Sequence, residues 1–169
     1  LDLLIIGGGA TGTGCAWDAA SRGNLRVACI DAGDWSSGTS SKSTKLVHGG
    51  VRYLEKAVRG LDWGQGCLVK EALHERRTVL KMAPHLTDAL PIMLPLYGAW
   101  WRAPYYWAGT KVYDLIASRH GAIQSSFVMG RERAIREFPL LRRDGLLGAL
   151  VYYDGQQDDA RMNVALAMT

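Results

Sequence analysis

The first part of the chain shows two apolar runs separated by a helical pattern. A short segment over residues 2–6, apolar after Asp2 and followed by glycines, predicts a short buried parallel strand. Small and apolar residues then recur at helical spacing over residues 11–22, and Gly23 ends that pattern. A second apolar run, residues 25–30, ends at Asp31. Strand, helix and strand within about 30 residues match one βαβ unit.

The remainder of the chain mixes amphipathic helices with strands. An apolar stripe predicts a helix over residues 65–82, with a frayed start because Gly64 and Gly66 are poor helix formers. Residues 90–97 contain two prolines and are predicted to form an edge or bulged strand. The other expected elements are a strand at 146–153 and helices at 105–118, at 131–138 and after Asp158 or Asp159. The pattern predicts an α/β fold.

The three glycines Gly7, Gly9 and Gly12 form a G-x-G-x-x-G sequence between the first strand and the first helix, here called the glycine fingerprint. Such glycines permit a tight turn, a close approach of backbone to a pyrophosphate, and close helix–strand packing. Asp31 follows Gly12 by 19 residues, at the end of the second strand, where a carboxylate can bind ribose hydroxyls. The same carboxylate repels a 2′-phosphate, so NADP is disfavoured. These residues alone do not distinguish NAD from FAD.

Charge and cysteine content exclude several classes of protein. The net charge is +4, but the basic residues are scattered and no nucleic-acid-binding motif accompanies them, so we expect no nucleic-acid partner. The three cysteines form no CxxC pair, which argues against a metal site and predicts reduced, mostly buried thiols. No apolar stretch is long enough for a membrane-spanning helix. The chain begins inside a strand without Met, so we expect it to be a fragment.

A long segment after Asp31 resembles a known family. Residues 39–55, TSSKSTKLVHGGVRYLE, are similar to the T-S-S-x-S-(S/T)-K-L-(I/V)-H-G-G-(L/V)-R-Y-L-E segment of FAD-dependent glycerol-3-phosphate dehydrogenases. Residues 69–76, 83–86 and 158–161 extend the resemblance along the chain, and residues 152–156 resemble the mitochondrial form. The implied fold is an FAD-binding Rossmann-like βαβ unit of the D-amino-acid oxidase and glutathione reductase class, with an incomplete α+β substrate domain.

The resemblance also implies domains and cofactor contacts. We expect residues 1–84 to belong to the FAD-binding domain, residues 85–155 to a substrate domain, and residues 156–169 to a helix that returns to the FAD-binding domain. The expected FAD contacts are Gly7, Gly9, Ala10, Thr11, Gly12, Asp31, Ala32, Thr39, Ser40, Ser41, Ser43, Thr44, Lys45, His48, Gly49 and Gly50.

The implied reaction is oxidation of sn-glycerol 3-phosphate to dihydroxyacetone phosphate, with hydride transfer to FAD and electron transfer to ubiquinone. Arg52 is the candidate for binding the substrate phosphate through its planar guanidinium. His48 is the candidate proton acceptor, and Tyr53 a hydrogen-bond donor to substrate. Without the resemblance, an Arg–Tyr pair is often a surface ion-pair group and a histidine beside two glycines is often a turn residue.

An aromatic segment bears on localisation. The segment from Tyr97 to Lys111 contains six aromatic residues and also Arg102, a composition typical of a membrane interface. Packing against another domain is the alternative. The resemblance implies a peripheral, monotopic protein of the mitochondrial inner membrane, or of a bacterial cytoplasmic membrane. The open alternatives for function are a glycerol-3-phosphate oxidase, another flavoenzyme of the same fold, and a non-catalytic dinucleotide-binding module.

Overall fold

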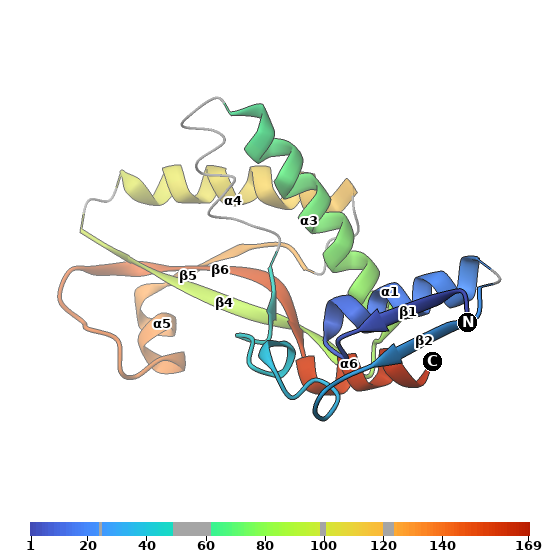
Figure 1. Ribbon diagram of the computed structural model, residues 1–169. Coiled ribbons are helices and arrows are strands. Elements are labelled where there is room, and N and C mark those ends of the chain that lie inside the picture. The colour runs from blue at the N-terminus through green and yellow to red at the C-terminus, as the bar shows by residue number, and fades with distance from the viewer. Residues whose placement is uncertain (24, 49–61, 99–100, 120–123) are drawn as a thin grey trace. The chain divides into compact units, whose positions relative to one another are not determined.

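The computed structural model describes residues 1–23, 25–48, 62–98, 101–119 and 124–169, which separate into two compact units (Figure 1). The first unit comprises Leu1–Leu46, His85–Thr87 and Gln157–Thr169, and the second comprises Val47–Pro84 and Asp88–Gln156. The last helix and the first strands belong to the same unit, and the boundary between the units differs from the expected domain boundary at residue 84. The assignment of domains to cofactor and substrate stays a prediction.

The first unit contains the predicted βαβ unit. Strand β1 (Leu3–Ile6) pairs in parallel with β2 (Val27–Ile30), and helix α1 (Ala10–Arg22) connects them and packs on both. The short helix η1 (Thr39–Ser41) and helix α6 (Asp159–Met168) complete the described part of this unit. Helix α6 runs beside α1 (Figure 1), so the end of the chain packs on its beginning.

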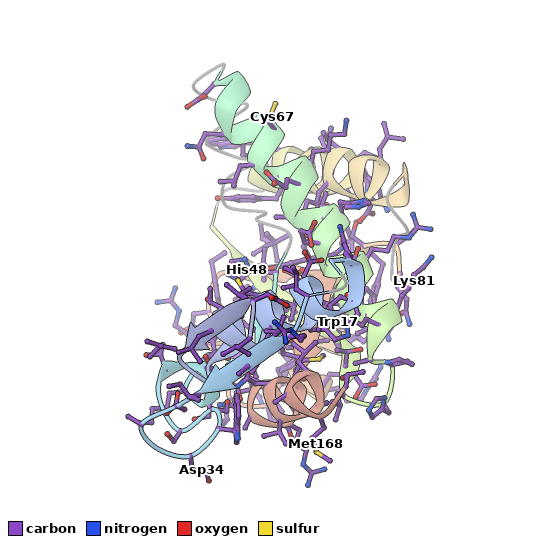
Figure 2. All side chains as sticks on the ribbon, turned by 45° about the vertical axis from the view of Figure 1, so that its right-hand side comes forward. Trp17, Asp34, His48, Cys67, Lys81 and Met168 are labelled. Atoms are coloured by element: carbon purple, nitrogen blue, oxygen red, sulfur yellow. The ribbon has the colours of Figure 1, made fainter. Side chains whose placement is uncertain are left out.

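Burial in the first unit is lower than the sequence pattern predicts. Ile6 is 80% exposed, so the expectation that the first strand is buried is wrong for the described chain, and Ile30 of the second strand is 49% exposed. Parallel strands are buried only where helices cover both faces, and α1 is the helix packed on these two strands in the part of the chain described. The expectation of buried thiols is also wrong, because Cys15 and Cys67 are exposed and Cys29 is half-buried; Figure 2 shows Cys67 projecting from its helix.

The larger sheet has the strand order β3–β6–β4, with β5 pairing antiparallel beside β6. Its strands are β3 (Leu46–Val47), β4 (Thr87–Tyr97), β5 (Phe127–Gly130) and β6 (Leu146–Gln157). Among the strands that the structure describes, β4 stands at the end of this order, as predicted for an edge strand from its two prolines. Strands β3 and β5 were not predicted, because two- and four-residue strands carry almost no periodic signal.

Three helices belong to the second unit: α3 (Trp63–Met82), α4 (Arg102–Arg119) and α5 (Arg131–Glu137). The predicted fraying of α3 is wrong, since the helix begins at Trp63 and includes both glycines. The side chain of Asp62 explains this start. It accepts hydrogen bonds from the backbone N–H groups of Gly64 at 2.9 Å and Gln65 at 3.3 Å, and such a cap offsets much of the low helix propensity of glycine.

The core of the second unit consists of two apolar clusters. Val69 and Leu73 of α3 pack against Tyr113 of α4, with Tyr152 of β6 beside them. The second cluster joins β5, β6 and α5 through Met129, Ala134, Ala149 and Val151. These residues place the apolar stripe of α3 against the interior, as the helical pattern predicts.

Candidate cofactor site

The glycine fingerprint forms a turn that only glycine fits at two positions. Gly7 has φ +123°, a conformation that side chains with a Cβ atom rarely adopt. A Cβ atom on Gly12 would overlap the carbonyl oxygen of Gly7, so helix and strand pack too closely for any larger residue. The turn is fixed to the sheet because the Gly7 N–H donates to the Ile30 carbonyl at 2.7 Å. This geometry matches the roles predicted for the first and third glycines.

The N-terminus of α1 is suited to an anion. Gly9 is its N-cap, and the first backbone bond of the helix runs from Thr13 N–H to the Gly9 carbonyl at 3.0 Å. The N–H groups of Thr11 and Gly12 therefore lie in the first turn, where a helix offers donors and the positive end of its dipole. That turn contains no acidic residue, so nothing in it opposes a phosphate.

Ser40 lies at this same helix end although it is 30 residues away in the sequence. Its hydroxyl oxygen accepts a hydrogen bond from Ala10 N–H at 2.9 Å. A Cβ atom on Gly9 would lie 3.0 Å from that oxygen, so the second glycine also leaves little free space. The fold thus brings together three residues that sequence analysis predicted as FAD contacts.

Asp31 lies at the end of β2 and also fixes the glycine fingerprint. One carboxylate oxygen accepts from Gly33 N–H at 2.8 Å and the other from Gly8 N–H at 2.5 Å. These backbone donors, Gly33 first, lower the pKa of Asp31 below its usual value, so the group is a carboxylate at neutral pH. Each oxygen keeps a further lone pair for a ribose hydroxyl. The ribose contacts of Asp31 and of neighbouring Ala32 stay predictions.

The serine-rich loop, residues 36–45, continues from this point. Thr39, Ser40 and Ser41 form η1, and the Ser41 hydroxyl donates to the Gly38 carbonyl at 3.2 Å. Lys45 has φ +61°, and its ammonium donates to the Ser41 and Ser43 carbonyls at 3.0 and 3.3 Å. The loop is therefore held by its own polar groups. Thr44 is exposed within it.

Asp159 of α6 fixes the end of this loop, and sequence analysis considered it only as a helix cap. Its carboxylate oxygen Oδ2 accepts from the Ser43 hydroxyl at 2.6 Å, from Ser43 N–H at 2.9 Å and from the Lys45 ammonium at 3.2 Å. The residue is 5% exposed. The Ser43 hydroxyl is the largest cause lowering the pKa of Asp159 to about 2, although burial acts in the opposite direction.

Asn163, one turn further along α6, contacts the glycine fingerprint. Its amide nitrogen donates to the Gly8 carbonyl at 2.8 Å, and its amide oxygen accepts from the Thr13 hydroxyl at 2.6 Å. Asn163 and Thr13 are each 2% exposed. Sequence analysis missed Asn163. The available signal was the match at residues 158–161, which placed a family motif at the start of this helix without revealing what it contacts.

The second unit contains a separate buried ion pair. The Arg76 guanidinium donates to Asp154 at 2.6 Å and to the Tyr113 hydroxyl at 3.0 Å, and all three residues are at most 3% exposed. Burial raises the pKa of Tyr113, and the charge of Asp154 adds to that shift, so the phenol stays neutral. A Cβ atom on Gly155 would lie 2.9 Å from the Val47 carbonyl, so β6 lies very close to β3.

His48 directly follows β3 and its side chain is exposed (Figure 2). Gly49, Gly50, Arg52 and Tyr53 lie outside the described residues, so their predicted roles stay predictions. Within the described ranges, no group of three or more His, Cys, Asp or Glu residues is arranged to hold a metal ion.

Comparison with known proteins agrees with this geometry. The family model "FAD dependent oxidoreductase" matches residues 2–169. The chain is 60% identical over 168 residues to the mitochondrial glycerol-3-phosphate dehydrogenase of Rattus norvegicus and 59% identical to that of Homo sapiens. Each match covers 99% of this chain and 23% of the relative, so the chain spans about a quarter of their length. The resemblance predicted from residues 39–55 is confirmed.

Solved structures show the same fold. The glycerol-3-phosphate dehydrogenase of Bacillus halodurans complexed with FAD is 30% identical, with a TM-score of 0.62 over 99% of this chain and 24% of that chain. The L-alpha-glycerophosphate oxidase of Mycoplasma pneumoniae with FAD bound has a TM-score of 0.64 over 99% of this chain and 41% of that chain. Its 13% identity supports the fold alone.

The residues present fit FAD. A pyrophosphate suits the N-terminus of α1, where Gly12 permits close packing and no acidic residue opposes it. Asp31 is an ionised acceptor at the end of β2, and the serine-rich loop brings Ser40 to the same helix end. The fold class and the cofactor expected from the sequence are thus confirmed: the chain belongs to the FAD-dependent oxidoreductase family.

Proposed function

We propose that the protein containing this chain oxidises sn-glycerol 3-phosphate to dihydroxyacetone phosphate and passes the electrons to a membrane quinone. The observation that carries this proposal is the 60% identity over 168 residues to mitochondrial glycerol-3-phosphate dehydrogenases. That alignment covers 99% of the chain, so it includes both the glycine fingerprint and the serine-rich loop. The names of these relatives also support a mitochondrial location.

The proposed chemistry assigns separate tasks to the chain's own residues. When bound, FAD supplies the hydride acceptor. Arg52 binds the phosphate dianion of the substrate, and Tyr53 donates a hydrogen bond to it. His48 takes the proton of the secondary hydroxyl, because a neutral imidazole nitrogen can act as a general base. The exposed position of His48 just after β3 is compatible with access to a small substrate.

Anaerobic reduction of the flavin tests the substrate directly. Addition of glycerol 3-phosphate to the purified intact protein should bleach the flavin absorbance, and glycerol should leave it unchanged because it lacks the phosphate that Arg52 binds. A protein that contains FAD but is not bleached by glycerol 3-phosphate would refute the proposed substrate.

The electron acceptor separates the two leading candidates. If the protein is a glycerol-3-phosphate oxidase, a possibility supported only at the level of fold, turnover in air should consume oxygen and produce hydrogen peroxide in equal amounts. A dehydrogenase should instead reduce a soluble quinone analogue with little peroxide. A protein that binds FAD but gives neither reaction would support the non-catalytic module.

A quinone acceptor requires contact with a bilayer, and α4 with the residue before it offers a surface for this contact. Trp101, Tyr105 and Trp107 are 59%, 45% and 48% exposed, a composition that favours the membrane interface. Lys111 contributes less than the sequence suggested, since its ammonium donates to the Ser126 carbonyl at 2.7 Å and to Asp114 at 3.3 Å. Of the helices described, none is long and apolar enough to cross a membrane. We propose a monotopic contact.

Liposome binding tests this contact. Replacing Trp101 and Trp107 with Ser should weaken binding of the intact protein to vesicles that contain anionic lipid, while turnover with a soluble acceptor stays unchanged. Unchanged vesicle binding would assign these rings to packing within the protein.

A further inference from the structure

Helix α6 contacts two separate segments of the cofactor site through side chains one turn apart. Asp159 accepts hydrogen bonds from Ser43 and Lys45 in the serine-rich loop, and Asn163 contacts Gly8 and Thr13 at the glycine fingerprint. Residues four apart lie on the same face of a helix. One rigid element therefore sets the distance between the two segments.

The contact with Asp159 depends on its charge. A single oxygen, Oδ2, receives two donors from Ser43 and one from Lys45, while Oδ1 accepts from Ala160 N–H at 2.8 Å. The amide nitrogen of an asparagine at this position would face either the donors of Ser43 and Lys45 or the N–H of Ala160, and a donor cannot bond to another donor. The Asp159→Asn change keeps the volume of the side chain and removes its fit to the loop.

The contact with Asn163 depends on its amide orientation. The Gly8 carbonyl can only accept, so the amide nitrogen must face it, and the oxygen must then face the Thr13 hydroxyl. The Gly8 carbonyl also accepts from Ser36 N–H at 3.2 Å, and the Gly8 N–H donates to Asp31. Hydrogen bonds with Asp31, Ser36 and Asn163 therefore fix Gly8, and the last of these residues belongs to α6.

We propose that Asp159 and Asn163 are positioning residues for FAD: α6 holds the serine-rich loop and the glycine fingerprint in the relative placement that FAD binding requires. The proposal rests on the cofactor of the proposed function and is independent of its substrate. Both side chains act through the segments they hold, because their polar atoms are occupied by Ser43, Lys45, Gly8 and Thr13.

The test is FAD affinity of the apoprotein, measured on the intact protein by quenching of flavin fluorescence. Asp159→Asn should weaken FAD binding about 10- to 150-fold, the range for loss of hydrogen bonds to a charged group. Asp158→Asn is the matched control, since it removes the same charge from the same helix end, and among the described residues its side chain bonds to Arg161 and not to the serine-rich loop or the glycine fingerprint. Its affinity should match the wild type, because Asn and Asp are equally good N-caps.

Asn163→Leu should weaken FAD binding by a smaller amount, roughly 2- to 12-fold, because the Gly8 carbonyl keeps its bond from Ser36. Thr13→Val removes the partner hydroxyl at nearly constant volume. Combined with Asn163→Leu, it should add little to the effect of Asn163→Leu alone, since that change already removes the hydrogen bond between the two side chains. Full additivity, or wild-type affinity in Asn163→Leu, would overturn the assignment of Asn163.

Thermal unfolding of each apoprotein distinguishes a role of Asp159 and Asn163 in folding alone from a role in positioning the FAD site. If the folded fraction of Asp159→Asn binds FAD as tightly as the wild type, Asp159 serves folding alone and the proposal fails. If Asp159→Asn does not fold, Ser43→Ala removes one hydroxyl from the same contact and should weaken FAD binding; unchanged affinity would again overturn the proposal. Failure to oxidise glycerol 3-phosphate, with these FAD affinities as expected, would refute the proposed substrate and leave this inference intact.

Discussion

Each unit buries a polar cluster, but the two clusters differ in what they hold. In the second unit, Arg76 joins side chains from three regular elements, namely Asp154 of β6, Tyr113 of α4 and its own helix α3. In the first unit, Asp159 bonds to Ser43 and Lys45 of the serine-rich loop, and Asn163 bonds to Gly8 and Thr13 at the fingerprint. One cluster connects elements that already pack through Val69 and Leu73, and the other holds polar and glycine-rich segments that contribute no residue to the two apolar clusters of the described chain.

The difference predicts different consequences of mutation. Loss of either charge of the Arg76–Asp154 pair leaves the other buried charge without its counter-ion, which destabilises the fold of the second unit. Loss of a contact made by α6 releases a loop whose backbone is already partly exposed, so ligand affinity should fall more than stability. The comparison would be wrong if mutations at Arg76 lowered mainly ligand affinity, or if mutations in α6 lowered mainly stability.

The largest effect is expected at the buried ion pair. Arg76→Met should destabilise the protein by about 3–5 kcal/mol, because it removes the guanidinium that neutralises the buried carboxylate of Asp154. Thermal or urea unfolding measures this loss. Arg77→Met is the matched control on the same helix and should change stability by less than about 1 kcal/mol, because Arg77 is only half-buried. The double change Arg76→Met with Asp154→Leu should recover part of the loss; no recovery would show that the pair itself is not the cause.

The next effect concerns the glycine fingerprint. Gly12→Ala should lower FAD affinity roughly 5- to 150-fold, since the added Cβ meets the Gly7 carbonyl and overpacking of this kind costs about 1–3 kcal/mol. Gly14→Ala is the control, because its Cβ meets nothing and alanine favours the helix. Flavin content after purification measures both. Equal loss of flavin in the two variants would contradict the assigned role of Gly12.

The contact of Asp159 with the serine-rich loop should weaken only at acidic pH. The pKa of Asp159 is lowered to about 2, below the usual value of 3.8, so its contribution is fully present above about pH 4 and is lost as the pH falls towards 2. Acid titration of FAD release should therefore show a component in this window that is absent from Asp159→Asn. A component of the same size in both proteins would assign it to other carboxylates.

The smallest effect is expected at an exposed ion pair of similar geometry. On α5, Nε of Arg133 lies 2.7 Å from Oε1 of Glu137, and both of these side chains are about half exposed. The distance is close to the 2.6 Å between the guanidinium of Arg76 and the carboxylate of Asp154, which are buried. Glu137→Gln should change stability by about 0.5 kcal/mol or less, because solvent screens such pairs. A loss comparable with that of Arg76→Met would mean that distance, and not burial, sets the strength of these pairs.

The sequence predicted what local pattern can encode. The βαβ unit, the stripe of α3, the edge position of β4 and the start of α6 after Asp158 all follow from periodicity, glycine, proline or capping signals. The contacts of α6 could not be predicted in this way. Thr13 and Asn163 are 150 residues apart in the sequence, as Ser43 and Asp159 are 116 apart, and no spacing rule connects them.

Local signals also failed where they competed. The glycines of α3 indicated fraying, but Asp62, the residue before the first residue of the helix, supplies the cap that holds the first turn. Arg76 lies within the predicted helix over residues 65–82, yet the helical pattern did not reveal Asp154 as its partner, 78 residues later. The short strands β3 and β5 form because β6 offers them backbone partners, which is a property of the sheet and not of their own residues.

Calorimetric titration of the intact protein, stripped of its flavin, with FAD and with NADP tests the central claim most directly. The account predicts saturable binding of FAD near one equivalent and no binding of NADP, because the carboxylate of Asp31 repels a 2′-phosphate at the end of β2. Absence of heat with FAD, or binding of NADP as tight as that of FAD, would contradict the assignment of this site.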